Sequence, residues 1–292
     1  MLSFSSESLK AHRAQTYHTA PGLRLTSPDE AVDFVDQRGF FFFWPIKGID
    51  FPSLWTATAG DRPVPDEHDD PGHVTWDWKD RLLGQHRWYY GRVLRRRNAM
   101  ISLSVLPYFY VLSPNLGNPE HDYQDQYMEG TITAEAKLIY EALLREGPLD
   151  TISLRKAAHL SSPGSDGRFS KAIDDLQMEF KLVPVGISQA GAWRYAFIYD
   201  LTHRHFPELI AQADSIYEST ARQKLTMLYF ESVGAAPQNH LARLFGWKPE
   251  ETEKSLQSLL SSGQLVLGDF PDQPHPWIGL PRLTDSLSAT KE

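Results

Sequence analysis

An apolar stripe runs from Phe169 to Phe180, with Ile173 and Leu176 between them. The intervals of four, three and four residues place all four side chains on one face of a buried helix. Aromatic residues then alternate with other residues from Trp193 to Tyr199, which is typical of a strand. The pattern therefore predicts a helix followed by a β-hairpin with its loop at 186–191.

Two more helices are predicted before this stripe, the first of them over 133–146. From residue 216 on, the same order of three helices and a hairpin returns, with Gly246 and Gly263 ending the second and third helices. The last strand of this second hairpin is expected at 277–280. Such a repeat is typical of winged-helix domains. We expect winged-helix units at 131–210 and 211–282.

The segment 27–112 shows the same order of elements less regularly. Ser27 to Glu30 forms a capping box that starts a helix, and two strands expected at 88–94 and 99–104 enclose a basic hairpin tip. We therefore predict an α+β, helix-rich fold of three tandem winged-helix (helix-turn-helix) units with short β-hairpin wings. The other segments are predicted to be a flexible arm at 1–26, a linker at 113–130 and a disordered tail at 283–292.

Composition narrows the classes of chemistry. The 292 residues include no cysteine, which excludes disulfides, thiolate nucleophiles and cysteine-bound metals. The first residues lack the apolar stretch of a secretory signal, and no apolar run reaches the ~20 residues of a membrane span. We expect a cytoplasmic protein with no membrane partner, and no phosphate-binding glycine loop or dinucleotide motif indicates a cofactor.

The distribution of charge points to one basic surface. The formal net charge of −8 disfavours indiscriminate binding to phosphate. Residues 81–97 nevertheless hold six arginines and no acid. This segregation favours the hairpin tip as the nucleic-acid contact.

Winged helices that bind DNA present basic or amide residues on the third helix. Here the outward residues after Phe169 include Asp174 and Asp175, which repel phosphate. We expect these units to act as supports. The candidate nucleic-acid-binding residues are Arg92, Arg95, Arg96, Arg97, Lys171 and Lys181.

Three segments carry a resemblance to a known family: FPSLW at 51–55, WYYGRVLRRRNAMISLSVLPYF at 88–109 and SKAIDDLQMEFKLVPVGIS at 170–188. Together with the tandem units, they resemble the AlkZ/YcaQ family of winged-helix DNA glycosylases, in its AlkZ-related branch, over about 28–270. The resemblance implies excision of alkylated bases and a hairpin that enters the minor groove. Double-stranded DNA is the partner it implies.

The chain departs from the family at the catalytic motif, which is a Gln, an aliphatic residue, then Gln or Asp. Phe40 to Trp44 stand where this motif belongs. The nearest carboxylates are Asp50 and Asp77, although each also suits a helix cap or a first helical turn. Aromatic side chains could stack on an extruded base or form core. These base-stacking candidates are Trp44, Trp55, Trp76 and Trp88.

Two main hypotheses follow. The protein binds damaged or distorted duplex DNA, with base excision left open, or it is a non-catalytic winged-helix scaffold or regulator that binds a protein partner. A third hypothesis, a metal site at His68 and His73, requires four converging ligands that a proline-rich loop rarely presents. We expect no metal and no cofactor.

Overall fold

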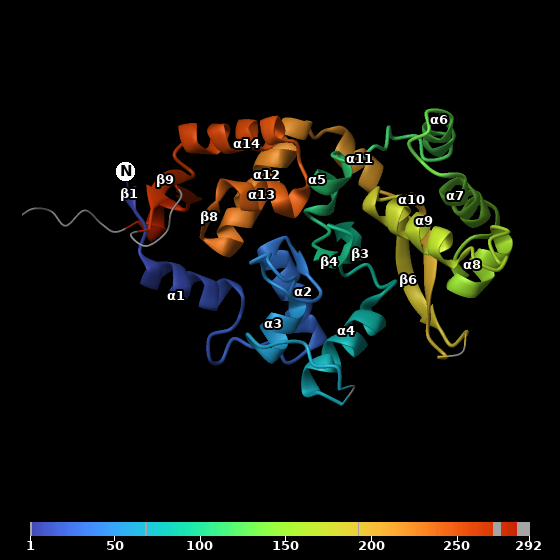
Figure 1. Cartoon of the computed structure of the whole chain (residues 1–292), viewed down its shortest axis with the longest axis horizontal. Coiled ribbons are helices and arrows are strands. Elements are labelled where there is room, and N and C mark those ends of the chain that lie inside the picture. The colour runs from blue at the N-terminus through green and yellow to red at the C-terminus, as the bar shows by residue number, and fades with distance from the viewer. Residues whose placement is uncertain (1, 68, 192, 271–275, 285–292) are drawn as a thin grey trace, which may run out of the picture. The chain divides into compact units, whose positions relative to one another are not determined.

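The computed structural model describes residues 2–67, 69–191, 193–270 and 276–284. Helices predominate in this mixed α+β chain (Figure 1). The described residues form two compact units: the first unit comprises those of 1–75 and 218–292, and the second comprises 76–217. The predicted 27–112 segment is thus divided between the two units at Thr75. Within the described part of the chain, no helix is long and apolar enough to cross a membrane.

The first unit combines both ends of the chain. Its elements are β1 (Leu2–Ser3), α1 (Ser6–Thr16), α2 (Pro28–Arg38), β2 (Phe40–Phe42), α3 (Leu54–Ala59), the 3-10 turn η1 (Pro71–His73), α12 (Glu218–Val233), β8 (Ala235–Pro237), α13 (Gln238–Phe245), α14 (Pro249–Ser261), β9 (Val266–Asp269), β10 (Trp277–Gly279) and the 3-10 turn η2 (Pro281–Leu283). Four strands form a sheet in the order β1-β9-β10-β8, where β1 is parallel to β9 and the other pairs are antiparallel.

Local sequence signals account for α2 and the strand after it. The Ser27 side chain accepts a hydrogen bond from the Glu30 backbone, Pro28 occupies the first turn, and Gly39 ends the helix with a φ of 80°. The next residues, 40–43, are at most 2% exposed. The residues that stand where the resemblance places a catalytic motif are therefore aromatic core.

Helix α1 lies inside the predicted flexible arm. It buries only Leu9, so its sequence shows little amphipathic pattern. Polar contacts instead attach it to the end of α12, where the Thr16 hydroxyl donates to the Ser232 carbonyl at 2.6 Å. These contacts join distant segments, and helical periodicity does not detect them. The predicted tail lies outside the described residues except for Leu283, in η2, and Thr284 after it.

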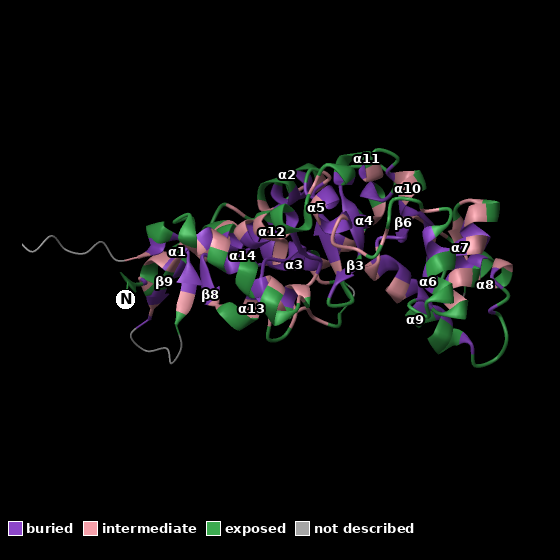
Figure 2. Cartoon of the chain, turned by 90° about the horizontal axis from the view of Figure 1, so that it is seen from above, coloured by how far each residue is buried: buried purple, intermediate pink, exposed green. Residues whose placement is uncertain are grey.

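The second unit begins within α4 (Val74–Leu82) and continues with β3 (Tyr89–Leu94), β4 (Arg97–Ile101), α5 (Leu106–Tyr110), α6 (Asp122–Met128), α7 (Ala134–Glu146), β5 (Leu149–Asp150), α8 (Thr151–Ala157), α9 (Asp166–Met178), β6 (Leu182–Ser188), β7 (Ala196–Leu201), α10 (Thr202–His205) and α11 (Leu209–Asp214). Its core joins the inner faces of α7, α8 and α9 to the sheet β5-β7-β6. Buried and exposed positions alternate along these helices (Figure 2).

The predicted linker at 113–130 contains a short helix, α6. Asp122 is buried and accepts hydrogen bonds from the backbone of Leu116 and Asn118, at 2.7 and 3.2 Å. The rings of Tyr123 and Tyr140 pack at 4.8 Å. These tertiary contacts order a polar segment whose composition alone indicates a loop.

Candidate nucleic-acid interface and carboxylate pocket

The hairpin of β3 and β4 ends in a two-residue turn made of arginines. Leu94 pairs with Arg97, which leaves Arg95 and Arg96 as the turn, with φ values of 55° and 56°. Two-residue hairpin turns with both central residues left-handed strongly prefer Asn-Gly. A side chain with a Cβ costs about 1–2 kcal/mol per residue in this conformation. The tip therefore carries two side chains that the turn itself disfavours.

Helix α9 supplies the acids that face the hairpin. Arg92 Nη1 lies 2.8 Å from Asp174 Oδ1, and Arg96 Nη1 lies 2.5 Å from Asp175 Oδ1. Lys171 also donates to Asp175, at 2.5 Å. The two arginine side chains remain 45% and 49% exposed, and such pairs contribute only about 0–1 kcal/mol. The outward acids of α9 thus orient the arginines and leave them able to exchange partners.

Lys181 does not share this surface. Its side chain is buried, its ammonium group donates to Asn115 Oδ1 at 2.5 Å, and Glu179 lies 3.3 Å away. Burial lowers the pKa of Lys181. We therefore leave Lys181 out of the candidate interface, which consists of Arg92, Arg95, Arg96, Arg97 and Lys171.

The four tryptophans proposed for base stacking divide into two pairs. Trp55 and Trp88 are 0% and 4% exposed and belong to the core, and the Trp55 indole donates to the Arg62 carbonyl at 3.0 Å. Trp44 and Trp76 are half-buried. The structure favours the core interpretation for Trp55 and Trp88.

The second candidate carboxylate, Asp77, lies in the first turn of α4, exposed and ion-paired with Arg81 one turn later. This is the ordinary place of an acid in a helix. His73 packs against Trp55 at 5.4 Å, and His68 lies outside the described residues. The residues that the structure describes hold no group of three histidine or acidic side chains able to bind a metal ion.

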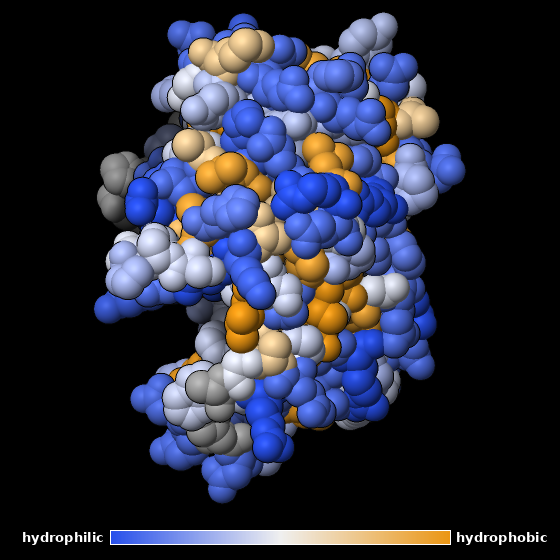
Figure 3. Space-filling view, turned by 90° about the vertical axis from the view of Figure 1, so that its right-hand side faces the viewer, coloured by the Kyte–Doolittle hydropathy of each residue, from blue (hydrophilic) through white to orange (hydrophobic). Residues whose placement is uncertain are grey.

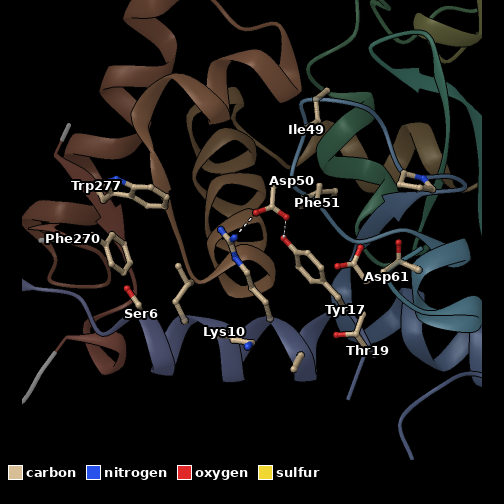
Figure 4. Close-up of a pocket in the computed structure, with 15 residues that line it drawn as sticks. Ser6, Lys10, Tyr17, Thr19, Ile49, Asp50, Phe51, Asp61, Phe270 and Trp277 are labelled. Atoms are coloured by element: carbon tan, nitrogen blue, oxygen red, sulfur yellow. Dashed lines mark hydrogen bonds and ion pairs between the residues drawn. The ribbon is translucent and has the colours of Figure 1, made fainter. Parts of the chain in front are cut away.

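Asp50, in contrast, lines a cavity of about 640 Å³ in the first unit (Figure 4). Its side chain is 46% exposed. Tyr17, from the end of α1, donates its hydroxyl to Asp50 Oδ1 at 3.0 Å, and Arg13 forms an ion pair with Oδ2. Each carboxylate oxygen therefore has a fixed donor, and Figure 4 shows the side chain of Tyr17 directed at Asp50.

The two donors are themselves well anchored. Arg13 also donates to the carbonyls of Val233 and Ala235, at 2.9 and 3.0 Å. Tyr17 is 9% exposed, and burial together with the Asp50 charge raises its pKa well above 10. The Tyr17 hydroxyl therefore remains a protonated donor at neutral pH. This arrangement holds the Asp50 carboxylate in one orientation.

The other end of the cavity is aromatic. Phe270 and Trp277 meet edge to face at 4.8 Å, and both line the cavity with Lys10 and Asp61. Sequence reasoning identified Asp50 but missed Arg13 and Tyr17. Their four-residue spacing would have placed them on one helical face, but no helix was expected there.

Comparisons with known proteins agree with this fold. The structure of the Streptomyces sahachiroi DNA glycosylase AlkZ superposes with a TM-score of 0.60 and 12% identity, over 96% of this chain and 71% of that one. The model of the AlkZ-related family matches residues 25–246, so the chain belongs to that family. The resemblance drawn from the sequence is thereby confirmed. No curated protein sequence matches the chain.

Proposed function

We propose that the protein binds damaged or distorted duplex DNA through the tip of the β3–β4 hairpin, as a glycosylase-like DNA-repair protein of the cytoplasm. Membership of the AlkZ-related family supports a role in DNA repair. The hairpin tip carries the proposal, because a turn that disfavours arginine holds two of them in succession. Conformational strain of this kind accumulates at functional sites.

We further propose that α7 to β7 and α12 to β10 are winged-helix units. Both run helix, strand, helix, helix, strand, strand. In each sheet the third strand lies between the other two, as β7 lies between β5 and β6, and β10 between β8 and β9. Shared order and shared strand arrangement support a structural repeat. The acids on α9 suit a unit that positions the hairpin.

Duplex binding by this interface is expected to depend strongly on salt. Each arginine that neutralises a phosphate releases counterions, so the affinity falls as salt rises. The net charge of −8 makes a general attraction to DNA unfavourable. Binding should therefore come from the few arginines of the tip.

The alternative function, binding of a protein partner, has its own support. Trp193 is 92% exposed beside β7, and Ile152 of α8 is 50% exposed. Hydrophobic residues also interrupt the hydrophilic surface in the view of Figure 3. Exposed apolar patches are typical of interaction sites. Under this alternative, the hairpin arginines are not needed for any activity.

Substitution of Arg95, Arg96 and Arg97 by Ala tests the proposal. A matched variant, with Arg145, Lys156 and Arg168 changed to Ala, removes the same charge from exposed positions of the same unit. The proposal expects weaker duplex binding and a smaller salt slope for the hairpin variant alone. Equal binding by both variants supports the alternative.

A further inference from the structure

We propose that the cavity beside Asp50 is a binding site for a free aromatic α-amino acid. The inference goes beyond the proposed binding to DNA, because it gives the first unit a small-molecule ligand of its own. All residues that line the cavity belong to the first unit. Its volume of about 640 Å³ lies within the range of ~300–1,000 Å³ that is usual for small-ligand sites.

The charges that line the cavity are balanced. Lys10 and Arg13 contribute two positive charges, and Asp50 and Asp61 contribute two negative charges. The charge of Arg13 is directed to Asp50 and to two backbone carbonyls. Lys10 is exposed and has no ion-pair partner among the residues that the structure describes. A zwitterion, which carries one charge of each sign and is neutral overall, matches this lining.

The aromatic end of the cavity provides the surface for a ring. Phe270 and Trp277 meet edge to face at 4.8 Å. Phe270 also stacks on Phe4 at 5.5 Å, whereas Trp277 is only half-buried. Stacked and edge-to-face contacts stabilise ring pairs beyond the burial of apolar area. We therefore place the ring of the ligand on the indole of Trp277.

Helix α1 sets the order of the groups along the cavity. The aromatic pair lies near its start, and Asp50 lies towards its end, where Arg13 and Tyr17 contact it (Figure 4). Ser6, Lys10 and Arg13 line the cavity from successive turns of one helical face. The helix advances by roughly 10 Å from the first of these residues to the last. Lys10 thus lies between the aromatic pair and Asp50. An aromatic amino acid has its ring at one end and both charges at the other, which is the same order.

Asp50 and Lys10 have the capacity to bind the two charged groups of the ligand. Tyr17 and Arg13 hold the Asp50 carboxylate in one orientation, and the side chain is 46% exposed. A carboxylate has about four acceptor positions, so two donors leave capacity for an ammonium group. The Lys10 ammonium donates to the carboxylate of the ligand. Both contacts are charge-assisted hydrogen bonds, which are stronger than neutral ones.

Calorimetric titration of the intact protein with L-phenylalanine tests the inference. Three analogues each lack one group that the site recognises. L-Phenylalaninamide lacks the carboxylate, N-acetyl-L-phenylalanine lacks the ammonium group, and L-alanine lacks the ring. We expect L-phenylalanine to bind at one site and each analogue to bind about tenfold more weakly or worse, since a hydrogen bond to a charged group contributes at least this factor.

A variant of Lys10 tests the assigned contact. Lys10→Met should weaken binding of L-phenylalanine by about tenfold and leave binding of L-phenylalaninamide unchanged, because the amide has no carboxylate to lose a partner. A general disturbance of the fold would weaken both ligands equally. Lys224→Met changes an exposed lysine of α12 in the same unit and serves as the matched control. It should bind both ligands like the parent.

Three results would overturn the inference. They are no binding of L-phenylalanine, equal affinities for L-phenylalanine and its amide, and equal affinities of Lys10→Met and Lys224→Met for L-phenylalanine. None of these titrations contains DNA. The proposed binding to duplex DNA therefore stands or falls by its own test.

Discussion

Arg96 and Asp175 form an ion pair of 2.5 Å between Nη1 and Oδ1, although they come from the hairpin tip and from α9. The same carboxylate accepts a hydrogen bond from Lys171. Asp175 therefore pairs with Arg96 and Lys171, two of the cations that we assign to the DNA interface. A phosphate must displace it before either cation can bind DNA.

Removal of this acid should strengthen DNA binding. Asp175→Asn keeps the shape of the side chain and frees Arg96 and Lys171 from a charge. We expect several-fold tighter duplex binding, and a salt slope steeper by about one for each released cation that then meets a phosphate. Asp166→Asn changes an exposed acid at the start of α9 and controls for net charge. Equal effects of the two variants would show that Asp175 has no special role.

Because the hairpin tip is strained, we expect that a substitution that relieves the strain raises the stability and weakens duplex binding. Replacing Arg95-Arg96 by Asn-Gly should raise the free energy of unfolding by about 1–2 kcal/mol, because these residues favour the left-handed turn. Duplex binding should weaken in the same variant. Arg97→Gly is the control, since Arg97 begins β4 and glycine should destabilise a strand. Urea unfolding measures the free energy of unfolding of each variant. An increase in Arg97→Gly without an increase in the Asn-Gly variant would refute the strain argument.

We predict that removal of the buried charge of Lys79 lowers the stability of the fold substantially. Its side chain is 0% exposed, donates to the Tyr195 hydroxyl at 2.8 Å and pairs with Asp80. Its ammonium also lies 4.6 Å from the Phe197 ring centroid. Lys79→Met should lower the free energy of unfolding by about 2 kcal/mol, because Asp80 loses its cationic partner and keeps the hydrogen bond from the Tyr195 hydroxyl. The exposed Lys156→Met should change it by less than about 0.5 kcal/mol. Equal urea midpoints for the two variants would contradict this account.

We predict that the stability of the second unit falls at acid pH because of His205. Burial, with a smaller contribution from the nearby His86, lowers the pKa of His205 from 6.5 to about 4. The unfolded chain therefore takes up this proton more readily than the folded chain. The contribution of neutral His205 to the free energy of unfolding is therefore complete above pH 6.5, and it is lost as the pH falls towards 4.

His205→Phe should keep the ring packed against His86 and Phe206, whose contacts are 4.1 and 4.6 Å, and remove the titration. Unfolding free energies measured between pH 7.5 and 4 should then fall less steeply for the variant. Parallel pH profiles for the variant and the parent would exclude this role of His205.

Local patterns predicted much of the fold. Thr133 caps α7, Gly147 ends it, and Phe169, Ile173 and Leu176 are buried on α9, as expected from their spacing. Phe180 was expected on the same helical face, but α9 ends at Met178 and Phe180 lies beyond it with a φ of 55°. The final strand was also expected close to where β10 lies. Helices α1 and α6 were missed because hydrogen bonds to distant segments order them, and such contacts leave no periodic pattern.

The candidate site was predictable only in part. A run of arginines identifies the hairpin, but the pairing of its side chains with α9 depends on tertiary structure. Asp50 was identified as a carboxylate near the missing motif. Its donors, Arg13 and Tyr17, come from a helix that the sequence did not indicate. Lys181 was included for its charge, and the folded chain buries it.

The central claim is that the hairpin tip provides the DNA contact. The most direct measurement is the affinity for a duplex containing N7-methylguanine as a function of salt concentration, for the parent and two triple variants. With Arg95, Arg96 and Arg97 changed to Ala, we predict weaker binding and a salt slope smaller by about one for each lost phosphate contact. The variant lacking Arg145, Lys156 and Arg168 should bind like the parent. An unchanged affinity and slope in the hairpin variant would contradict the account.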